Sequence, residues 1–329
     1  MKEKGKKMSI KFFLGFALFL MMIPILSGAQ EFPNKPINIL VGFAPGGAVD
    51  PTIRMLASKA EKFLGQPFVI TNNGGGGGMV ALSMVTKEKA DGYHLVGCTS
   101  TGLVWVPQFQ AVPYKLDDFA FIMHYGSPQT GLSVRADSPW TTLKGFVEYA
   151  KNNPWKVTYS TTGIGTPMHL AMEFIAKQEG IQWTHIPYRG NGPALTALLG
   201  GHVTAQSGGP EVIPHIRAGT IRLLATQGEK RRKNFSNVPT LQELGYDFVS
   251  ETMFMLTAPK GTPPSIVRKL DEAFRKAMED PEFIQLMENM EMEITYRNAA
   301  DTKKFLEEAY TRLGRLIQDL KIPTETEKK

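Results

Sequence analysis

The hydrophobic pattern of residues 37–64 predicts a buried strand followed by a helix. Ile37–Val41 is almost continuously apolar, which is typical of a strand in the interior of a sheet. After the turn signal at Phe43–Gly47, apolar residues recur every three or four positions, the period of an amphipathic helix. Asp50 followed by Pro51 resembles a helix start with Asp50 as the capping residue. The pattern therefore predicts a glycine loop at the carboxyl end of a strand.

A loop of this kind favours the binding of an anion. The first N–H groups of a helix have no partner within it, and the helix dipole adds positive potential there. We therefore expect a small anion held largely by the backbone, although a tight turn without a ligand fits the pattern too. The segment from Gly42 to Gly47 lacks the Lys and Ser/Thr that a phosphate-binding loop requires, so nucleotide binding is not supported.

Strand and helix patterns alternate along the rest of the chain, which predicts βαβ units and an α/β fold. The arrangement of the opening unit recurs later: a strand at 157–160, a glycine loop at Thr161–Gly165 and a helix start at Thr166-Pro167. We expect two lobes, each a mainly parallel sheet flanked by helices. Lobe 1 is predicted from residues 30–125 with 252–329, lobe 2 from 126–251, and the hinge near 125–130 and 250–258.

Five consecutive glycines, Gly74–Gly78, interrupt the pattern after the second predicted strand. Such a run is too costly in conformational entropy for the middle of a helix or strand. It predicts either a plain linker or a loop that approaches a ligand closely. The single cysteine, Cys98, lies in an apolar strand and has no partner for an internal disulfide, so we expect a buried, unreactive thiol.

The N-terminal segment has the features of a Sec-type signal peptide, cleaved after Ala29. A lysine-rich start precedes the apolar run Phe12–Leu26 and the small residues Ser27–Ala29. An uncleaved membrane anchor is the alternative, but the apolar run is short for a membrane span. The leader holds five Lys and one Glu of a chain with formal charge +6, so the mature chain is nearly neutral and nucleic-acid binding is not implied. Export without disulfides predicts a bacterial periplasmic protein.

Common catalytic signatures are absent. The sequence contains no His-Glu-x-x-His, Gly-x-Ser-x-Gly or Ser-x-x-Lys motif. Gly163-Ile164-Gly165 lacks the third glycine of a dinucleotide fingerprint. His169 and Glu173 lie one helical turn apart, but two ligands are too few for a metal site. We therefore expect no catalytic residue, no metal and no cofactor.

Seven segments stand out, in order along most of the mature chain: FPNKPINILVGFAPGGAVD, LGQPFVITNNGGGGG, ADGYHLVGCTS, STTGIGTPMHLAMEF, IPYRGNGPALTALLGGHV, VPTLQELGYDF and APKGTPPSIVRKL. Together they resemble the tripartite tricarboxylate transporter substrate-binding proteins, also called the TctC/Bug family. The resemblance implies a two-lobe periplasmic-binding-protein (Venus flytrap) fold. It also implies a receptor that delivers a small organic carboxylate to the membrane subunits of a transporter.

The resemblance further implies which residues surround the carboxylate. They are Phe43, Ala44, Gly46, Gly47, Asp50, Thr99 and Ser100 in the first lobe, and Thr161, Thr162, Gly163, Gly165, Thr166, His169, Arg189 and Ser207 in the second. Two departures from the family pattern concern the ligand rather than the fold: Asn72-Asn73 and five glycines replace a segment with an Arg and a Pro, and Thr204 replaces an Asp.

The identity of the acid is not readable from these residues. Di- and tricarboxylates, acidic amino acids and aromatic acids all remain open. We expect a monomer that does not bind nucleic acid. Two other functions remain as alternatives: a periplasmic partner of a membrane sensor kinase, which would use the same fold, and an exported hydrolase, for which no nucleophile–base pair is visible.

Overall fold

Two sheets organise the chain in the computed structural model, which describes residues 31–250 and 252–320. The predicted leader and its cleavage site lie outside the described residues. The part of the chain from Lys35 onward forms one compact unit, to which both sheets belong. Among the residues described, no helix has the length and apolar character needed to cross a membrane.

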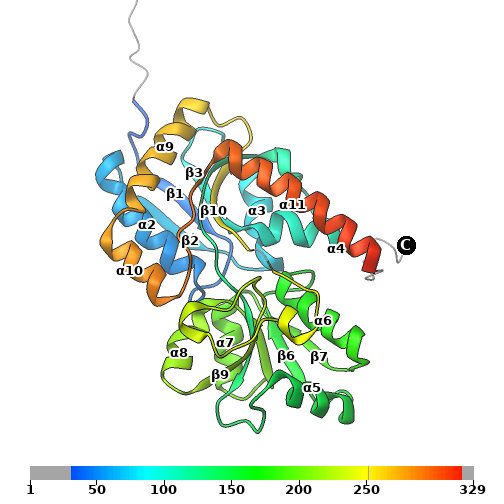
Figure 1. Ribbon diagram of the computed structural model, residues 1–329. Coiled ribbons are helices and arrows are strands. Elements are labelled where there is room, and N and C mark those ends of the chain that lie inside the picture. The colour runs from blue at the N-terminus through cyan, green and yellow to red at the C-terminus, as the bar shows by residue number, and fades with distance from the viewer. Residues whose placement is uncertain (1–30, 251, 321–329) are drawn as a thin grey trace, which may run out of the picture. The chain divides into compact units, whose positions relative to one another are not determined.

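The first sheet has six strands in the order β11-β4-β10-β3-β1-β2 and, with its helices, forms the first lobe (Figure 1). Its strands are β1 (Ile37–Val41), β2 (Phe68–Asn72), β3 (His94–Thr99), β4 (Phe119–Gly126), β10 (Phe254–Pro259) and β11 (Arg297–Asn298). Its helices are α2 (Val49–Leu64), α3 (Met79–Val85), α4 (Val106–Phe109), α9 (Pro264–Ala277), α10 (Pro281–Asn289) and α11 (Ala299–Leu320). Helix α2 packs against α9 and α10, while α11 packs on β4.

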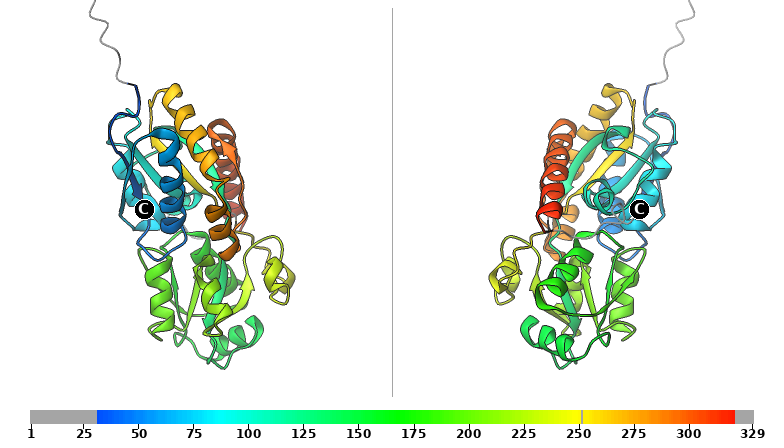
Figure 2. Two further views of the ribbon diagram at one scale, coloured as in Figure 1. Left: turned by 90° about the vertical axis from the view of Figure 1, so that its left-hand side faces the viewer. Right: turned by 90° about the vertical axis from the view of Figure 1, so that its right-hand side faces the viewer.

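The second sheet has five strands in the order β7-β6-β8-β5-β9 and forms the second lobe, with helices on its flanks (Figure 2). Its strands are β5 (Gly131–Arg135), β6 (Thr158–Thr161), β7 (Thr184–Pro187), β8 (Ala205–Gly208) and β9 (Ile221–Thr226). Its helices are α5 (Leu143–Asn152), α6 (Pro167–Glu179), α7 (Asn191–Leu199) and α8 (Ile213–Arg217).

The fold is the predicted two-lobe α/β arrangement, but both sheets are mixed rather than mainly parallel. The βαβ units form the parallel pairs β1–β2, β1–β3, β6–β7 and β6–β8. Strand β10 runs antiparallel to β3 and β4, and β5 runs antiparallel to β8 and β9. The chain passes from the first sheet to the second between β4 and β5, and it returns between β9 and β10. These two connections are not βαβ crossovers, and the strands beside them, β4, β5 and β10, pair antiparallel. The exact limits of the lobes and of the hinge stay a prediction.

The beginnings of two helices show how the glycine loops are held. Thr166 caps α6 as predicted, because its Oγ1 accepts the N–H of His169 at 3.3 Å. The start of α2 differs from the prediction. The capping residue is Ala48 and has no side-chain bond, while Asp50 lies inside the first turn. Asp50 instead binds side chains, since its Oδ1 accepts from Arg54 Nε at 2.9 Å and Asn72 Nδ2 at 2.8 Å.

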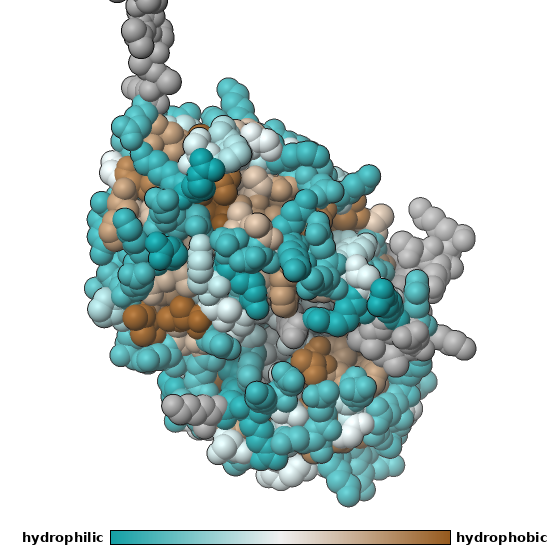
Figure 3. Space-filling view, turned by 45° about the horizontal axis from the view of Figure 1, so that its top comes forward, coloured by the Kyte–Doolittle hydropathy of each residue, from teal (hydrophilic) through white to brown (hydrophobic). Residues whose placement is uncertain are grey.

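The interior and the surface follow the expected division. Cys98 is a free, fully buried thiol in β3, and burial raises its pKa far above the ordinary value, so it is unreactive as predicted. The face drawn in Figure 3 is mainly hydrophilic, and hydrophobic residues gather on it only in small patches. Such scattered exposure is ordinary for a globular protein.

Candidate functional site

A small cavity lies where the loops of the two lobes meet. Its volume is about 30 Å³, which is room for one or two water molecules. The first lobe contributes Phe43, Gly47, Ala48, Val49, Thr99, Thr101 and Phe254; the second contributes Thr162, Met168, Asn191, Gly209 and Pro210; the segments between the lobes contribute Pro128, Thr130 and Thr252. The lobes are therefore close together, and a larger ligand can enter only when they separate.

The first-lobe wall is the start of α2. The first backbone bond of this helix runs from the N–H of Thr52 to the C=O of Ala48 at 3.4 Å. The N–H groups of Val49 and Asp50 therefore have no acceptor within the helix. Together with the helix dipole, they make this wall attractive to an anion.

Hydroxyl and amide groups complete the lining. Thr162 Oγ1, Asn191 Oδ1 and Thr252 Oγ1 are buried and have no hydrogen-bond partner among the described residues. Buried polar atoms are nearly always paired, so unpaired ones at a cavity indicate that water or a ligand binds there. No Lys or Arg is among the described residues that line the cavity, so the available donors are neutral.

The glycine loops of the two lobes touch through their backbones. The N–H of Ala44 donates to the C=O of Arg189 at 3.1 Å. A Cβ on Gly46 would lie 3.4 Å from Gly192 Cα, and a Cβ on Gly192 would lie 2.5 Å from the oxygen of Pro45. Of these residues, Ala44, Gly46 and Arg189 were predicted to contact the ligand. All three lie at the contact between the lobes, and the exposed Arg189 side chain does not line the cavity. Their contact with a ligand stays a prediction.

The run Gly74–Gly78 also lies at this contact. A Cβ on Gly74 would be 2.2 Å from the oxygen of Arg189, and a Cβ on Gly163 would be 3.2 Å from the nitrogen of Gly77. None of the five glycines lines the cavity. The run is therefore a close-approach loop, but it approaches the backbone of the other lobe.

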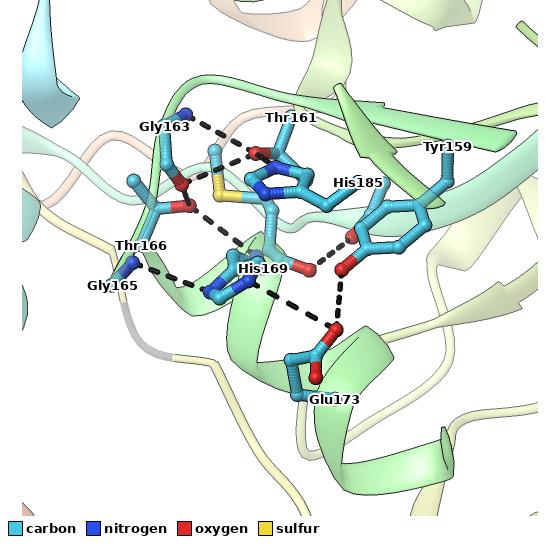
Figure 4. A network of polar contacts seen from close by, with 10 residues as sticks. Tyr159, Thr161, Gly163, Gly165, Thr166, His169, Glu173 and His185 are labelled. Atoms are coloured by element: carbon cyan, nitrogen blue, oxygen red, sulfur yellow. Dashed lines mark hydrogen bonds and ion pairs between the residues drawn. The ribbon is translucent and has the colours of Figure 1, made fainter. Parts of the chain in front are cut away.

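The loop from Thr161 to Thr166 is held by a network of polar contacts (Figure 4). Thr161 Oγ1 accepts the N–H of Gly163 at 3.1 Å and lies 2.7 Å from His185 Nε2. Thr166 Oγ1 donates to the C=O of Gly163 at 2.8 Å. The N–H of Gly165 donates to His169 Nδ1 at 3.3 Å. Of this loop only Thr162 lines the cavity, so the other residues hold Thr162 in place.

Two histidines support this network in their neutral form. The rings of His169 and His185 lie 4.3 Å apart. Burial lowers both pKa values, and the neighbouring His169 helps to lower the pKa of His185 to about 3. Glu173, 3.9 Å from His169, acts in the opposite direction and accepts a bond from Tyr159. Within residues 31–250 and 252–320, no group of three or more His, Cys, Asp or Glu residues is placed to hold a metal ion.

Of the remaining predicted residues, some line the cavity and others lie behind the residues that line it. Phe43, Gly47 and Thr99 line the cavity. Ser100 lies behind it, where its hydroxyl accepts the N–H of Met253 at 3.0 Å. Ser207 is also behind the lining: its hydroxyl donates to the C=O of Met168 at 2.9 Å and accepts from Gln227 Nε2 at 2.7 Å.

Asp50 supports the loop and does not line the cavity. Replacing Asp50 by alanine removes an acceptor shared by Arg54 and Asn72, so we expect the free energy of unfolding to fall by about 1–2 kcal/mol in urea titrations. Asp50→Asn keeps an oxygen at Oδ1 and should bind a carboxylate within about twofold of the unmodified protein. A loss of binding in Asp50→Asn at unchanged stability would show that Asp50 contacts the ligand.

Several residues that line the cavity were not predicted from the sequence. Asn191 lies in the Gly-Asn-Gly turn that begins α7, and Gly209 follows β8 in a polar loop, so both carried the same loop-after-strand signal as the predicted sites. Thr130 and Thr252 lie in the extended segments between the lobes. No local pattern distinguishes such residues, because their position depends on how two distant segments are placed.

Two lobes with a small cavity between them, lined by hydroxyls, an amide and apolar side chains, are typical of two-lobe solute-binding proteins. The model of the tripartite tricarboxylate transporter family receptors matches residues 52–322. This chain therefore belongs to that family, whose members are periplasmic binding proteins and not enzymes.

Known relatives cover nearly the whole chain. A Cupriavidus necator protein, described as a UPF0065 protein in the gbd 5′ region, is 40% identical over 306 residues, covering 92% of this chain and 93% of that protein. The structure of the periplasmic binding protein BugD is 27% identical with a TM-score of 0.81, covering 89% of this chain and 100% of BugD. A solved R. palustris protein with adipate is 27% identical with a TM-score of 0.80, covering 88% of this chain and 98% of that one.

Proposed function

We propose that this solute-binding protein captures a small dicarboxylate between its lobes, in the periplasm, and delivers it to the membrane subunits of a tripartite tricarboxylate-type transporter. The observation that carries the proposal is the two unpaired, buried hydroxyls at the cavity, Thr162 Oγ1 and Thr252 Oγ1, opposite the start of α2, because a hydroxyl can donate to a carboxylate. The adipate held by the R. palustris relative supports the choice of a dicarboxylate. The N-terminal leader supports export.

Binding proceeds from one wall to the other. With the lobes apart, one carboxylate meets the N–H groups at the start of α2 and the hydroxyls of Thr99 and Thr101. Closure then adds two donors from the second lobe, the hydroxyl of Thr162 and the amide Nδ2 of Asn191. A ligand drives closure only by binding the closed form more tightly than the open form, and these second-lobe groups supply that difference.

Neutral donors suffice for this task. Hydrogen bonds from hydroxyl and N–H groups to a carboxylate are charge-assisted and about twice as strong as those between neutral partners. Phe43, Met168 and Phe254 supply apolar lining for the carbon chain between the carboxylates. The remaining residues of the predicted site act as supports: Ala44, Gly46 and Arg189 at the contact between the lobes, and Thr161, Gly163, Gly165, Thr166, His169, Ser100 and Ser207 behind the lining.

Thermal unfolding in the presence of organic acids tests the proposal. Adipate at about 100 times its dissociation constant should add roughly 2.7 kcal/mol to the free energy of unfolding. The neutral diamide of adipate has the same length without the charges and should give no shift. If a sugar raises the melting temperature and no mono-, di- or tricarboxylate does, the proposed ligand class is wrong.

A further inference from the structure

A carboxyl group is buried directly behind the cavity wall. Glu211 lies in the short helical turn Pro210–Val212 that follows β8, and only 7% of its surface is exposed. Its Oε1 accepts the N–H of Gly209 at 3.0 Å and Gln206 Nε2 at 3.3 Å. Its Oε2 is buried and has no hydrogen-bond partner in the described part of the chain. One oxygen therefore supports the wall, and the other is unpaired.

The unpaired oxygen lies close to the lining. Gly209 and Asn191 both line the cavity. A Cβ on Gly209 would lie 2.8 Å from Glu211 Oε2 and 2.8 Å from Asn191 Nδ2. The carboxyl group therefore lies beside two residues of the lining without lining the cavity itself. A charge on Glu211 and a charge in the cavity would therefore repel each other across a medium of low dielectric constant.

The surroundings of Glu211 offer little compensation for a negative charge. Gln206 on β8 and Asn191 on α7 are neutral. Among the described residues, the charged group that favours its ionised form is Arg232, from the segment after β9. Arg232 is itself buried, is also attracted by Glu291, and donates to the C=O of Gln129. Burial outweighs the opposing effects of the N–H groups of Glu211 itself and of Gly209, of Arg232 and of Gln206, and raises the pKa of Glu211 to about 7.

We propose that Glu211 couples ligand binding to proton uptake, so that the cavity takes its dianion only with Glu211 as a neutral carboxylic acid. This inference rests on the proposed function. Glu211 does not touch the ligand and is a positioning residue, because it holds the N–H of Gly209 with Oε1 whether or not Oε2 carries the proton. When Glu211 is ionised in the empty protein, its carboxylate must take up a proton from solvent as the ligand binds.

The pH dependence of adipate binding tests the inference. Between pH 6.5 and 8.5 adipate remains a dianion, because ordinary carboxylic acids have pKa values near 4. Calorimetric titration should show the dissociation constant of the unmodified protein rising at least about fivefold over this range. In Glu211→Gln the constant should stay near the value that the unmodified protein has at pH 6.5. Glutamine keeps an oxygen that accepts from Gly209, so the wall should persist.

Glu148→Gln is the matched control, because it removes an exposed carboxyl group of the same lobe, on α5. It should retain the full pH dependence. Equal slopes in Glu211→Gln and the unmodified protein would overturn the inference while leaving the proposed function intact. Absence of binding at every pH, with adipate and with shorter dicarboxylates alike, would contradict the proposed dicarboxylate class itself.

A second measurement needs no variant. Titrations of the unmodified protein at pH 7.5 in buffers of different ionisation enthalpy report the protons taken up with each adipate. We expect an uptake of more than about half a proton, since Glu211 is then mostly ionised in the empty protein and neutral in the complex. Zero uptake would overturn the inference even if Glu211→Gln failed to fold.

Discussion

Replacing Gly192 by alanine should weaken carboxylate binding by at least about a hundredfold, a loss of roughly 2.7 kcal/mol. A Cβ on Gly192 would lie 2.5 Å from the oxygen of Pro45 and 2.7 Å from the carbonyl carbon of Gly46, both in the loop of the other lobe. The lobes could then no longer approach, and the second-lobe groups at the cavity would not reach the ligand. Calorimetric titration with adipate measures the loss.

The stability of Gly192→Ala should fall by no more than about 1–2 kcal/mol. The separated lobes lose their contact, while alanine in the first turn of α7 has the higher helix propensity and offsets up to about 1 kcal/mol of that loss. Gly145→Ala is the matched control. Gly145 occupies the first turn of α5, and its new Cβ would meet only Thr142 Oγ1, at 3.5 Å. Unchanged affinity in Gly192→Ala would show that binding does not require the contact between the glycine loops.

Replacing Thr162 by valine should weaken adipate binding about ten- to a hundredfold. The hydroxyl of Thr162 lines the cavity and is unpaired, and a hydrogen bond to a charged group contributes about 1.5–3 kcal/mol. Valine keeps the shape of the side chain, so the empty protein should be as stable as before or up to about 1 kcal/mol more stable, because a buried unpaired hydroxyl is removed. Urea unfolding and calorimetric titration measure the two effects.

Thr226→Val distinguishes the two effects of the Thr162 substitution. Thr226 Oγ1 is likewise buried and unpaired, but it lies in β9 and does not line the cavity. This variant should share the change in stability and bind adipate normally. If Thr162→Val also bound adipate normally, its hydroxyl would not contact the ligand, and the second-lobe half of the proposed site would have to be placed elsewhere.

The parts of the fold that could be predicted are those encoded by local patterns. The strand–glycine loop–helix units at β1–α2 and β6–α6 follow from apolar periodicity and turn residues within about 30 positions, and Thr166 was recognisable as a helix cap. Asp50 shows the limit of such patterns. Its carboxylate binds Asn72, 22 residues away, and that distant partner replaces the capping role that Asp-Pro indicated.

The cavity itself depends on contacts that no local pattern contains. Thr252 and Asn191 line it because segments far apart in the chain meet there. Conversely, Ala44, Gly46 and Arg189 stand in the right loops, yet the short distances between the two backbones place them at the contact between the lobes. Choosing between a ligand contact and a lobe contact requires positions in space, which periodicity does not provide.

The glycine contact between the lobes separates two properties that evolution can then change independently. In the proposed function, closure depends on backbone contacts at Gly46, Gly74 and Gly192. These contacts are the same whichever acid is bound. Under the same proposal, selectivity depends on side chains such as Thr162 and Asn191, which line the cavity. A substitution in the second group can alter the preferred acid while the closing motion is inherited unchanged. One scaffold can thereby diversify into receptors for many nutrients through a few side-chain replacements.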